Sequence, residues 1–309
     1  MKDAVKKQKI GIIGAGAMGC LHAAFFVKAG LDTYIYENDP AVVDSLREGI
    51  MVLSDKPETV SVRTSSDPAV IGECSTVFLF VKSHATDSAM KEAAHRIRNG
   101  AIVVSLQNGL GNVEKIREYV PAERIVFGTT SMGASKKDLR TLVPGGAGTI
   151  IIGGRNHSAI RTVFGILVHS SLNVTITDDP ETAIWKKAIV NAGINPLGAI
   201  LGLPNGKLVE IPEILKLQEL IVVEAVSAAA AHGIQAESDE MIGLTRDVCR
   251  KTSVNICSML QDIRAGRKTE IESITGEILK AAANHGLPAP VNESVYLLVR
   301  ALENRGAPD

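Results

Sequence analysis

The residue types that could carry out chemistry gather in one stretch of the second half of the chain. Lys187, Asn191 and Asn195 lie four residues apart, so a helix there would carry all three side chains on one face. A lysine ammonium can donate a proton and stabilise a developing negative charge, while neutral amides can hold a small polar ligand. The alternative is an exposed helical stripe with ordinary surface amides.

Three further polar residues follow along the chain. Asn255 and Ser258 lie three apart in a segment, Ser238–Ile263, that we expect to form one helix, and Glu270 lies beyond it. Singly, each is typical of a protein surface. Together with the lysine and its amides they supply a cation, several neutral donors and one carboxylate. Binding a 2-oxo acid and transferring a proton to it require such a set.

A glycine-rich loop near the start of the chain predicts a dinucleotide site. The loop consists of Gly14, Ala15, Gly16, Ala17, Met18 and Gly19, and it follows an apolar run and precedes a helix-like segment. In such a loop the first glycine allows a tight turn and the second lets the backbone approach a pyrophosphate. The third allows close packing of the helix, whose first amides bind the phosphates. The pattern alone is weak, but its position between a strand and a helix favours dinucleotide binding.

Glu37 bears on which dinucleotide this would be. It ends the second predicted strand, 37 − 14 = 23 residues after the first glycine of the loop. A carboxylate at this position can accept hydrogen bonds from the adenosine ribose hydroxyls but would repel a 2′-phosphate. The next residues, Asn38 to Pro40, supply no Arg or Lys to hold that phosphate. Glu37 therefore favours NAD(H), the alternative being a solvated acid at a strand end.

Two more polar side chains follow strands of the same region. Lys82 comes after the run Thr76–Val81, and Asn108 comes after Ala101–Leu106 within Gln107–Gly109. Ligands bind beyond the carboxyl ends of strands in parallel sheets. Each residue has an ordinary explanation, since Asn-Gly is a common turn and a strand-end lysine is usually solvated. At neighbouring strand ends beside a cofactor loop, both become candidates.

The elements that position these residues predict two domains. Apolar runs in the first half predict strands at Lys9–Ile13, Thr33–Glu37, Val60–Thr64, Thr76–Val81, Ala101–Leu106 and Arg124–Gly128. Helix-like segments lie between them, and after Asp178 the chain reads as almost wholly helical. We therefore predict an α/β protein. Residues 1–177 would form a Rossmann-type, doubly wound dinucleotide-binding domain, and residues 178–309 an all-helical substrate and catalytic domain.

The composition excludes several classes of protein. Lys and Arg total 33 against 34 Asp and Glu in 309 residues, so the net charge of −1 leaves no electrostatic footprint for nucleic acid or an anionic membrane surface. No apolar run approaches the roughly 20 residues that a membrane helix needs, and the basic start at residues 1–9 lacks the apolar core of a signal peptide. Four cysteines without close spacing predict reduced thiols in a cytoplasmic protein. The seven scattered histidines favour no metal site.

Several of these stretches resemble the ketopantoate reductase (2-dehydropantoate 2-reductase) family, over essentially the whole chain. The resemblance is carried by Gly14–Gly19, Val81-Lys82, Gln107–Gly109, Trp185–Lys187, Asn191–Pro196, Pro204–Gly206, Asn255–Arg264 and Thr269-Glu270. The later stretches are far more specific than the glycine loop. The resemblance implies a Rossmann domain and a helical domain like those of 6-phosphogluconate dehydrogenases, with the active site in the cleft between them.

The resemblance also implies roles for single residues. Lys187 matches the family's catalytic lysine, its general acid. The substrate-binding positions match Asn191, Asn195, Asn205 and Ser258, with Asn255 beside them. The cofactor-side positions match Lys82, Asn108, Ala134 and Glu270, of which Glu270 could also touch the substrate. Members that use NADPH usually carry a basic residue where this chain has Glu37, so NADP(H), the family default, stays open beside NAD(H).

The activity that the resemblance implies is the reduction of ketopantoate to pantoate by hydride transfer from NAD(P)H, in pantothenate and coenzyme A biosynthesis. One alternative is a reductase of the same build that acts on another 2-oxo acid. The other is a non-catalytic dinucleotide-binding sensor, which would need neither Lys187 nor the amide stripe. We expect a small-molecule 2-oxo acid as the partner, and neither nucleic acid nor membrane. The apolar Leu208–His232 segment could pack within the chain or across a homodimer.

Overall fold

The structure, a computed structural model, describes residues 8–305, so most of the basic start considered above lies outside the described residues. The chain divides into two compact units. Unit 1 comprises the described residues up to Gln107 together with Asn112–Pro180, and unit 2 comprises Asn108–Gly111 and the described residues from Glu181 onward. Two features differ from the division expected at residues 177/178. The chain passes into unit 2 slightly later, and the short segment after Gln107 also belongs to that unit.

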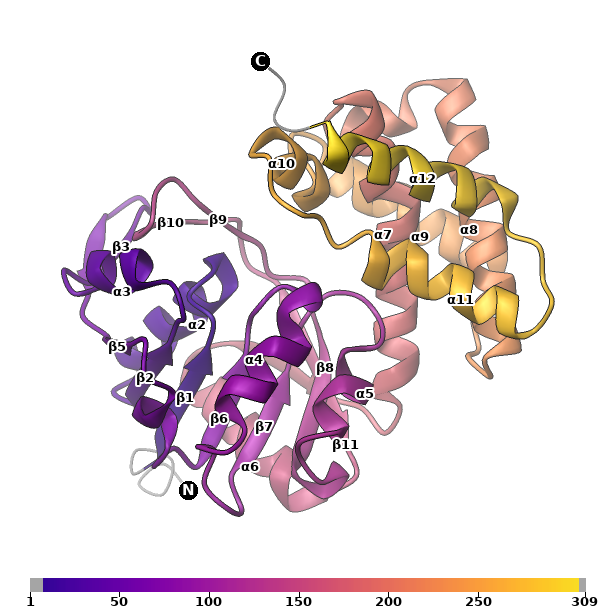
Figure 1. Ribbon diagram of the computed structural model, residues 1–309. Coiled ribbons are helices and arrows are strands. Elements are labelled where there is room, and N and C mark those ends of the chain that lie inside the picture. Colours follow the sequence, from indigo (N-terminus) through magenta and orange to yellow (C-terminus); the bar gives the residue numbers. More distant parts are fainter. Residues whose placement is uncertain (1–7, 306–309) are drawn as a thin grey trace. The chain divides into compact units, whose positions relative to one another are not determined.

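Unit 1 is built on an eight-stranded sheet with the order β12-β11-β8-β7-β6-β1-β2-β5 (Figure 1). Its strands are β1 Lys9–Ile13, β2 Asp32–Tyr36, β5 Arg63–Ser65, β6 Thr76–Leu79, β7 Ile102–Ser105, β8 Ile125–Thr130, β11 Thr149–Gly154 and β12 Asn173–Ile176. Strand β11 runs antiparallel to β8, and the other pairs are parallel. From β5 through β2, β1, β6 and β7 to β8, the strands follow the 3-2-1-4-5-6 order of dinucleotide-binding folds.

The central strands β1 and β6 are mostly apolar and are buried on both faces of the sheet. Ile12 and Phe78 belong to a core cluster on one face, whereas their chain neighbours Ile13 and Leu79 belong to a cluster on the other. Helices α2 (Ala17–Lys28) and α6 (His157–His169) contribute to the first cluster, and α4 (Thr86–Ala93) and α5 (Asn112–Arg117) to the second. The predicted doubly wound α/β class is confirmed.

A second, four-stranded sheet of unit 1 escaped prediction. Its order is β4-β3-β10-β9, from β3 Ile50–Val52, β4 Glu58–Val60, β9 Ala134–Lys136 and β10 Thr141–Pro144. The single strand expected at Val60–Thr64 is wrong, because the chain leaves this sheet after β4 and enters the large sheet at β5. Strands of three or four residues are too short to show a period in the sequence. The other short elements of unit 1 are helix α3 (Pro40–Leu46) and three 3₁₀ turns at Pro68–Ile71, Ser83–Ala85 and Ala122–Arg124.

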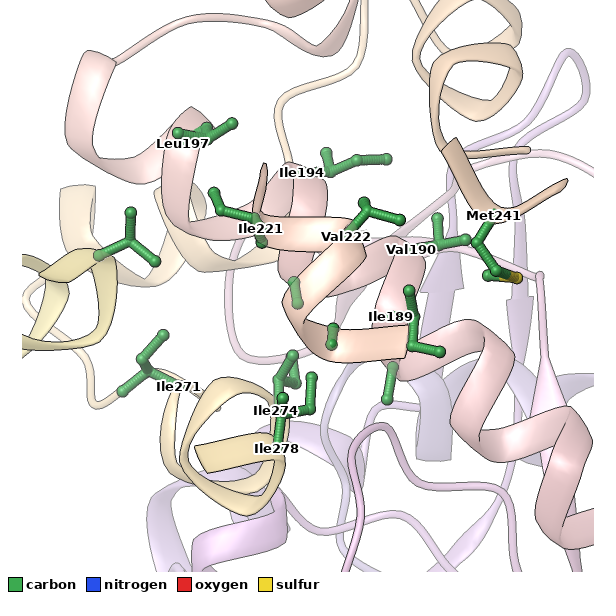
Figure 2. Close-up of a cluster of buried hydrophobic side chains, with 14 of the residues drawn as sticks. Ile189, Val190, Ile194, Leu197, Ile221, Val222, Met241, Ile271, Ile274 and Ile278 are labelled. Carbon is green, nitrogen blue, oxygen red and sulfur yellow. The ribbon is translucent and has the colours of Figure 1, made fainter. Parts of the chain in front are cut away.

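Unit 2 is helical. Its helices are α7 Pro180–Leu201, whose first residue is assigned to unit 1, α8 Pro212–Ala231, α9 Ser238–Lys251, α10 Ser258–Arg264, α11 Glu277–Asn284 and α12 Pro290–Asn304. A 3₁₀ turn covers Asn205–Val209 and a π-helical turn covers Glu272–Gly276. Figure 2 shows the core of the unit, in which Ile189 and Ile194 of α7 lie among apolar side chains of α8, α9 and α11.

Two expectations for the helices are wrong. The predicted helix Ser238–Ile263 breaks between α9 and α10, because there the backbone bonds to another segment: Asn205 N–H donates to the Asn255 carbonyl at 2.9 Å. Gly206 makes the same kind of bond to Ser253, and a Cβ on this glycine would lie 2.7 Å from Ser253 Cβ. The sequence also predicts a helix over Pro180–Asn195 that ends before Pro196, whereas α7 continues past Pro196 to Leu201. Its second half is buried almost all round, so packing outweighs the helix-breaking tendency of proline.

Candidate active site

The glycine loop of unit 1 has the geometry that a pyrophosphate requires. Gly14 has a φ of +96°, which favours glycine, and a Cβ there would lie 2.8 Å from Val81 Cγ1. At Gly19 a Cβ would lie 2.0 Å from the Gly14 carbonyl oxygen, so any larger residue would push helix α2 off the loop. Around Gly16 the nearest atom to such a Cβ is the Phe80 carbonyl oxygen at 3.9 Å. The loop is therefore packed on both sides and open at its middle glycine, which fits a bound dinucleotide phosphate.

Two charged side chains hold Ala15 within this loop. Glu37 accepts a hydrogen bond from the Ala15 amide at 2.7 Å through Oε2 and one from the Asp39 amide at 3.1 Å through Oε1. Lys136, on strand β9, donates to the Ala15 carbonyl oxygen at 3.1 Å. Sequence reasoning missed Lys136, because no motif marks it and the small sheet that presents it was not foreseen. Ala134, expected on the cofactor side, lies on the same strand.

A buried amide network fixes the ends of two central strands of unit 1. Gln107 donates to the Val81 carbonyl oxygen and to Thr86 Oγ1, each at 2.8 Å, and accepts from Ser105 Oγ at 3.0 Å. Because Val81 precedes Lys82, this network sets the direction in which the chain leaves β6. Lys82 itself caps the 3₁₀ turn that begins at Ser83 and is half-buried. Gln107 belongs to a stretch quoted for the family resemblance, but sequence reasoning gave it no role.

In unit 2 the structure brings three of the candidate residues into direct contact. Lys187 Nζ donates to Asn108 Oδ1 at 2.6 Å, and Asn108 Nδ2 lies 3.4 Å from Glu270 Oε2. Burial lowers the pKa of Lys187 from 10.5 to about 8, and the negative charge of Glu270 opposes that lowering. An ammonium with such a pKa is well suited to give up a proton near neutral pH. We refer to these three residues as the lysine triad.

Asn108 reaches Lys187 because the backbone just after it, at Gly109 and Leu110, packs closely against Ser273. Leu110 N–H donates to the Ser273 carbonyl oxygen at 2.7 Å. Gly109 has a φ of +83°, and a Cβ there would lie 2.5 Å from Ser273 Oγ, so only glycine fits. Ser273 belongs to the π-helical turn that follows Glu270. Such turns occur frequently at functional sites, and this one positions both the loop and the carboxylate.

The amide residues of unit 2 have different surroundings. Asn191 is half-buried, while Asn195 and Asn205 are buried. Asn205 Nδ2 donates to Thr252 Oγ1 at 2.8 Å, and its Oδ1 is buried without a hydrogen-bond partner among the described residues. Asn255 and Ser258 do not share a helix as expected: Asn255 is exposed in the break before α10, and Ser258 is exposed at the first position of α10. Asn255 still approaches Asn205 through the backbone bond described above.

Within residues 8–305, no group of three His, Cys, Asp or Glu side chains is arranged to hold a metal ion. The same residues contain no helix that is both long and apolar enough to span a membrane.

Comparison with known proteins gives matches over both units. The family model "Ketopantoate reductase PanE/ApbA" matches residues 10–157, and "Ketopantoate reductase PanE/ApbA C terminal" matches residues 179–303. The chain is 32% identical to a 2-dehydropantoate 2-reductase of Halobacterium salinarum, over 96% of this chain and all of that protein.

Solved structures agree with these matches. A ternary structure of D-mandelate dehydrogenase with NADH and anilino(oxo)acetate is similar with a TM-score of 0.92 at 25% identity, covering 96% of this chain and 99% of that one. A ketopantoate reductase of the PanE/ApbA family from Ralstonia eutropha is similar with a TM-score of 0.89 at 27% identity, with the same coverage.

The class of protein follows from three findings: the Rossmann strand order of unit 1, its open glycine loop and the relatives named above. It is an oxidoreductase that uses a nicotinamide dinucleotide. Because the family models match both halves and a relative 32% identical aligns along the whole chain, the chain belongs to the ketopantoate reductase family.

Proposed function

We propose that this chain reduces 2-dehydropantoate (ketopantoate) to pantoate, a step of pantothenate and coenzyme A biosynthesis, with Lys187 as the general acid. The observation that carries this proposal is the lysine triad: a lysine whose pKa is lowered to about 8, bonded to an amide and next to a single carboxylate. Relatives of the family named for this reaction align over nearly the full length of the chain.

The reaction adds a hydride to C2 of the oxo acid and a proton to its oxygen. A bound reduced nicotinamide supplies the hydride. As negative charge develops on the carbonyl oxygen, Lys187 stabilises it and transfers a proton from Nζ, which leaves the lysine neutral. Asn108 holds Nζ at 2.6 Å and thereby fixes the direction of the ammonium. Glu270 keeps the lysine protonated before the oxo acid arrives, because its charge favours the cation.

The remaining polar residues of unit 2 would bind the substrate. We assign Asn191, Asn195 and Ser258 to the substrate carboxylate and the C4 hydroxyl, as the family resemblance implies. Asn205 fits the hydroxyl particularly well, because its buried Oδ1 lacks a partner among residues 8–305 and would accept from an O–H donor. Asn255 supports Asn205 through its backbone carbonyl rather than through its side chain.

The cofactor preference follows from Glu37. The hydrogen bond from the Ala15 amide holds this carboxylate against the glycine loop, and the bond from the Asp39 amide orients it further. In dinucleotide-binding folds an acidic residue at this position accepts from the adenosine ribose hydroxyls. A 2′-phosphate at that place would meet a negative charge, so we propose NADH as the preferred cofactor and NADPH as the weaker one. The similar D-mandelate dehydrogenase structure contains NADH. Lys136 adds positive charge to the same loop, so the preference has to be measured with both cofactors.

A second candidate function is the reduction of another 2-oxo acid. It is favoured by the similarity to D-mandelate dehydrogenase, which reaches a TM-score of 0.92. The two substrates differ in the group attached to the oxo acid. Ketopantoate has a hydroxyl that can donate a hydrogen bond to Asn205 Oδ1, whereas the oxo acid related to mandelate has an aromatic ring. Substrate preference therefore distinguishes them.

The test is the oxidation of NADH and NADPH by the purified chain with ketopantoate, phenylglyoxylate, pyruvate and 2-oxoisovalerate. Fast turnover of ketopantoate with NADH supports both the substrate and the cofactor assignment. Fast turnover with NADPH alone refutes the cofactor assignment only, and preference for phenylglyoxylate favours the second candidate. Binding of NADH without turnover of any oxo acid would contradict the enzymatic proposal and favour a dinucleotide sensor.

The cysteines bear on where the protein works. All four are unpaired and buried, as is usual for proteins of a reducing compartment. We therefore propose the cytoplasm as its location.

A further inference from the structure

The residues on either side of Glu270 are held by a single helix, α12. Thr269, directly before Glu270, donates to Glu303 Oε1 twice, from its backbone N–H and from its hydroxyl, each at 2.7 Å. Thr269 is 1% exposed and the Glu303 side chain 9% exposed, so water competes little for these bonds. The Thr269 hydroxyl also accepts from Ile271 N–H at 3.1 Å, which turns the chain around Glu270.

The following turn is tied to the same helix. Glu272, two residues after Glu270, accepts from Tyr296 Oη at 2.8 Å and pairs with Arg300. Arg300 Nε in turn lies 3.2 Å from Glu303 Oε2, so a single arginine joins the two anchoring carboxylates. Helix α12 thus holds Thr269 before Glu270 and the side chain of Glu272 after it, at the entry to the π-helical turn.

We propose that Glu303 is a positioning residue for the reaction: through Thr269 it holds Glu270 against Asn108 and hence against Lys187. This inference rests on the proposed function of Lys187 as general acid. Glu303 carries out no chemistry itself. It accepts the backbone N–H of a buried turn that would otherwise lack a partner, and the turn places a carboxylate within reach of the asparagine that bridges to the lysine.

Loss of the Glu303 contacts should change a measurable quantity, the pKa of Lys187. The negative charge of Glu270 acts on Lys187 and favours the protonated lysine. If the turn relaxes and the carboxylate moves away, the pKa of Lys187 falls below its value of about 8. A role of Glu303 confined to folding would change the thermal stability and leave this titration where it is.

The experiment compares Glu303→Ala with Glu303→Gln, whose amide oxygen can still accept from Thr269. Glu293→Ala is the matched control, since Glu293 is an exposed carboxylate in the first turn of the same helix. The first readout is the pH profile of kcat/KM for the oxo acid with NADH. The second needs no turnover: the rate at which an amine-acylating reagent modifies Lys187 at each pH, measured by peptide mass spectrometry.

We expect Glu303→Ala to move both profiles toward lower pH by roughly half a unit or more and to lower kcat by about tenfold, whereas the other two variants behave as the wild type. Unshifted profiles in a folded, less stable Glu303→Ala protein would overturn the inference. If that variant does not fold, Thr269→Val removes both hydrogen bonds of the Thr269 hydroxyl, to Glu303 and from Ile271 N–H, and keeps the backbone bond to Glu303. It should shift both profiles in the same direction, and unshifted profiles would overturn the inference. A wild-type chain without turnover would refute the proposed function, while the acylation profile would still decide the role of Glu303.

Discussion

Replacing Glu270 by Gln tests the electrostatics of the lysine triad. The amide keeps the size of the side chain and one acceptor oxygen for Asn108, and it removes the negative charge. Burial lowers the pKa of Lys187 to about 8, and the Glu270 carboxylate is the charge that opposes this lowering. Without that charge the ammonium is less favoured, so the pKa of Lys187 should fall further.

The contacts set the size of the effect. Since Asn108 bridges the two groups with bonds of 2.6 and 3.4 Å, the carboxylate lies at most about 8 Å from the ammonium. At an effective dielectric constant of about 20, opposite unit charges at that separation attract by about 2 kcal/mol. This energy corresponds to about 1.5 pKa units, which would move the pKa of Lys187 from about 8 to about 6.5.

The assay is the pH dependence of kcat/KM for the reduction of the oxo acid, which reports groups of the enzyme before the oxo acid binds. Reduction needs protonated Lys187, so the rate is constant below its pKa and falls above it. At pH 7.5 the shift leaves roughly one eighth of the wild-type proportion of protonated lysine.

A carboxylate of the neighbouring helix provides the control for this shift. Glu277→Gln removes a charge that lies next to exposed Lys280, and its rate should still fall at about pH 8. A Glu270→Gln profile that also falls near pH 8, or that shifts upward, would refute the assignment of Glu270 as the countercharge.

Three other substitutions test the remaining parts of the site. Lys187→Ala should lower kcat by about 10²- to 10⁴-fold, the usual contribution of a general acid, with the dissociation constant of NADH nearly unchanged; a rate near that of the wild type would exclude the proposed role. Glu37→Arg should raise the ratio of kcat/KM for NADPH over NADH by about tenfold or more, since a repulsive charge becomes attractive; an unchanged ratio would mean that Glu37 does not set the preference. Gly19→Ala should abolish NADH binding and lower the melting temperature, because its Cβ would lie 2.0 Å from the Gly14 oxygen. Gly243→Ala, within α9, is the control and should be neutral or slightly stabilising, because no described atom beyond the local helix backbone and the adjacent residues lies within 4 Å of the added carbon.

The fold of unit 1 could be predicted because its signals are local. Continuous apolar runs such as Thr76–Val81 indicate strands that are buried on both faces, and the glycine loop marks the passage from β1 to α2. The small sheet could not be predicted in this way, because its strands gain their stability from pairing between distant segments. Strand β3, for example, pairs with β10, about ninety residues later in the chain.

The helical unit shows the limits of periodicity. The pattern from Ser238 to Ile263 is helical throughout. Between α9 and α10, however, the carbonyl groups of Ser253 and Asn255 accept hydrogen bonds from Gly206 and Asn205, and the helix is interrupted there. Conversely, Pro196 predicts a helix end, and burial of α7 on nearly all sides carries the helix past it. In both places contacts between distant segments outweigh the local conformational preference, and such contacts cannot be read from a short stretch of sequence.

The sequence by itself determined the α/β class, the dinucleotide loop and the residues that the family resemblance offers for chemistry, because strand burial, glycine spacing and helical periodicity are properties of short segments. The tertiary structure decided which of those residues meet. Lys187 and Asn108 are 79 positions apart and Asn108 and Glu270 are 162 apart, and their contact depends on Gly109 packing against Ser273. The pKa of Lys187 was likewise decided by the structure, because desolvation and a neighbouring charge depend on three-dimensional surroundings. The same holds for Glu303, an unremarkable acid in the sequence that the fold places on the turn before Glu270.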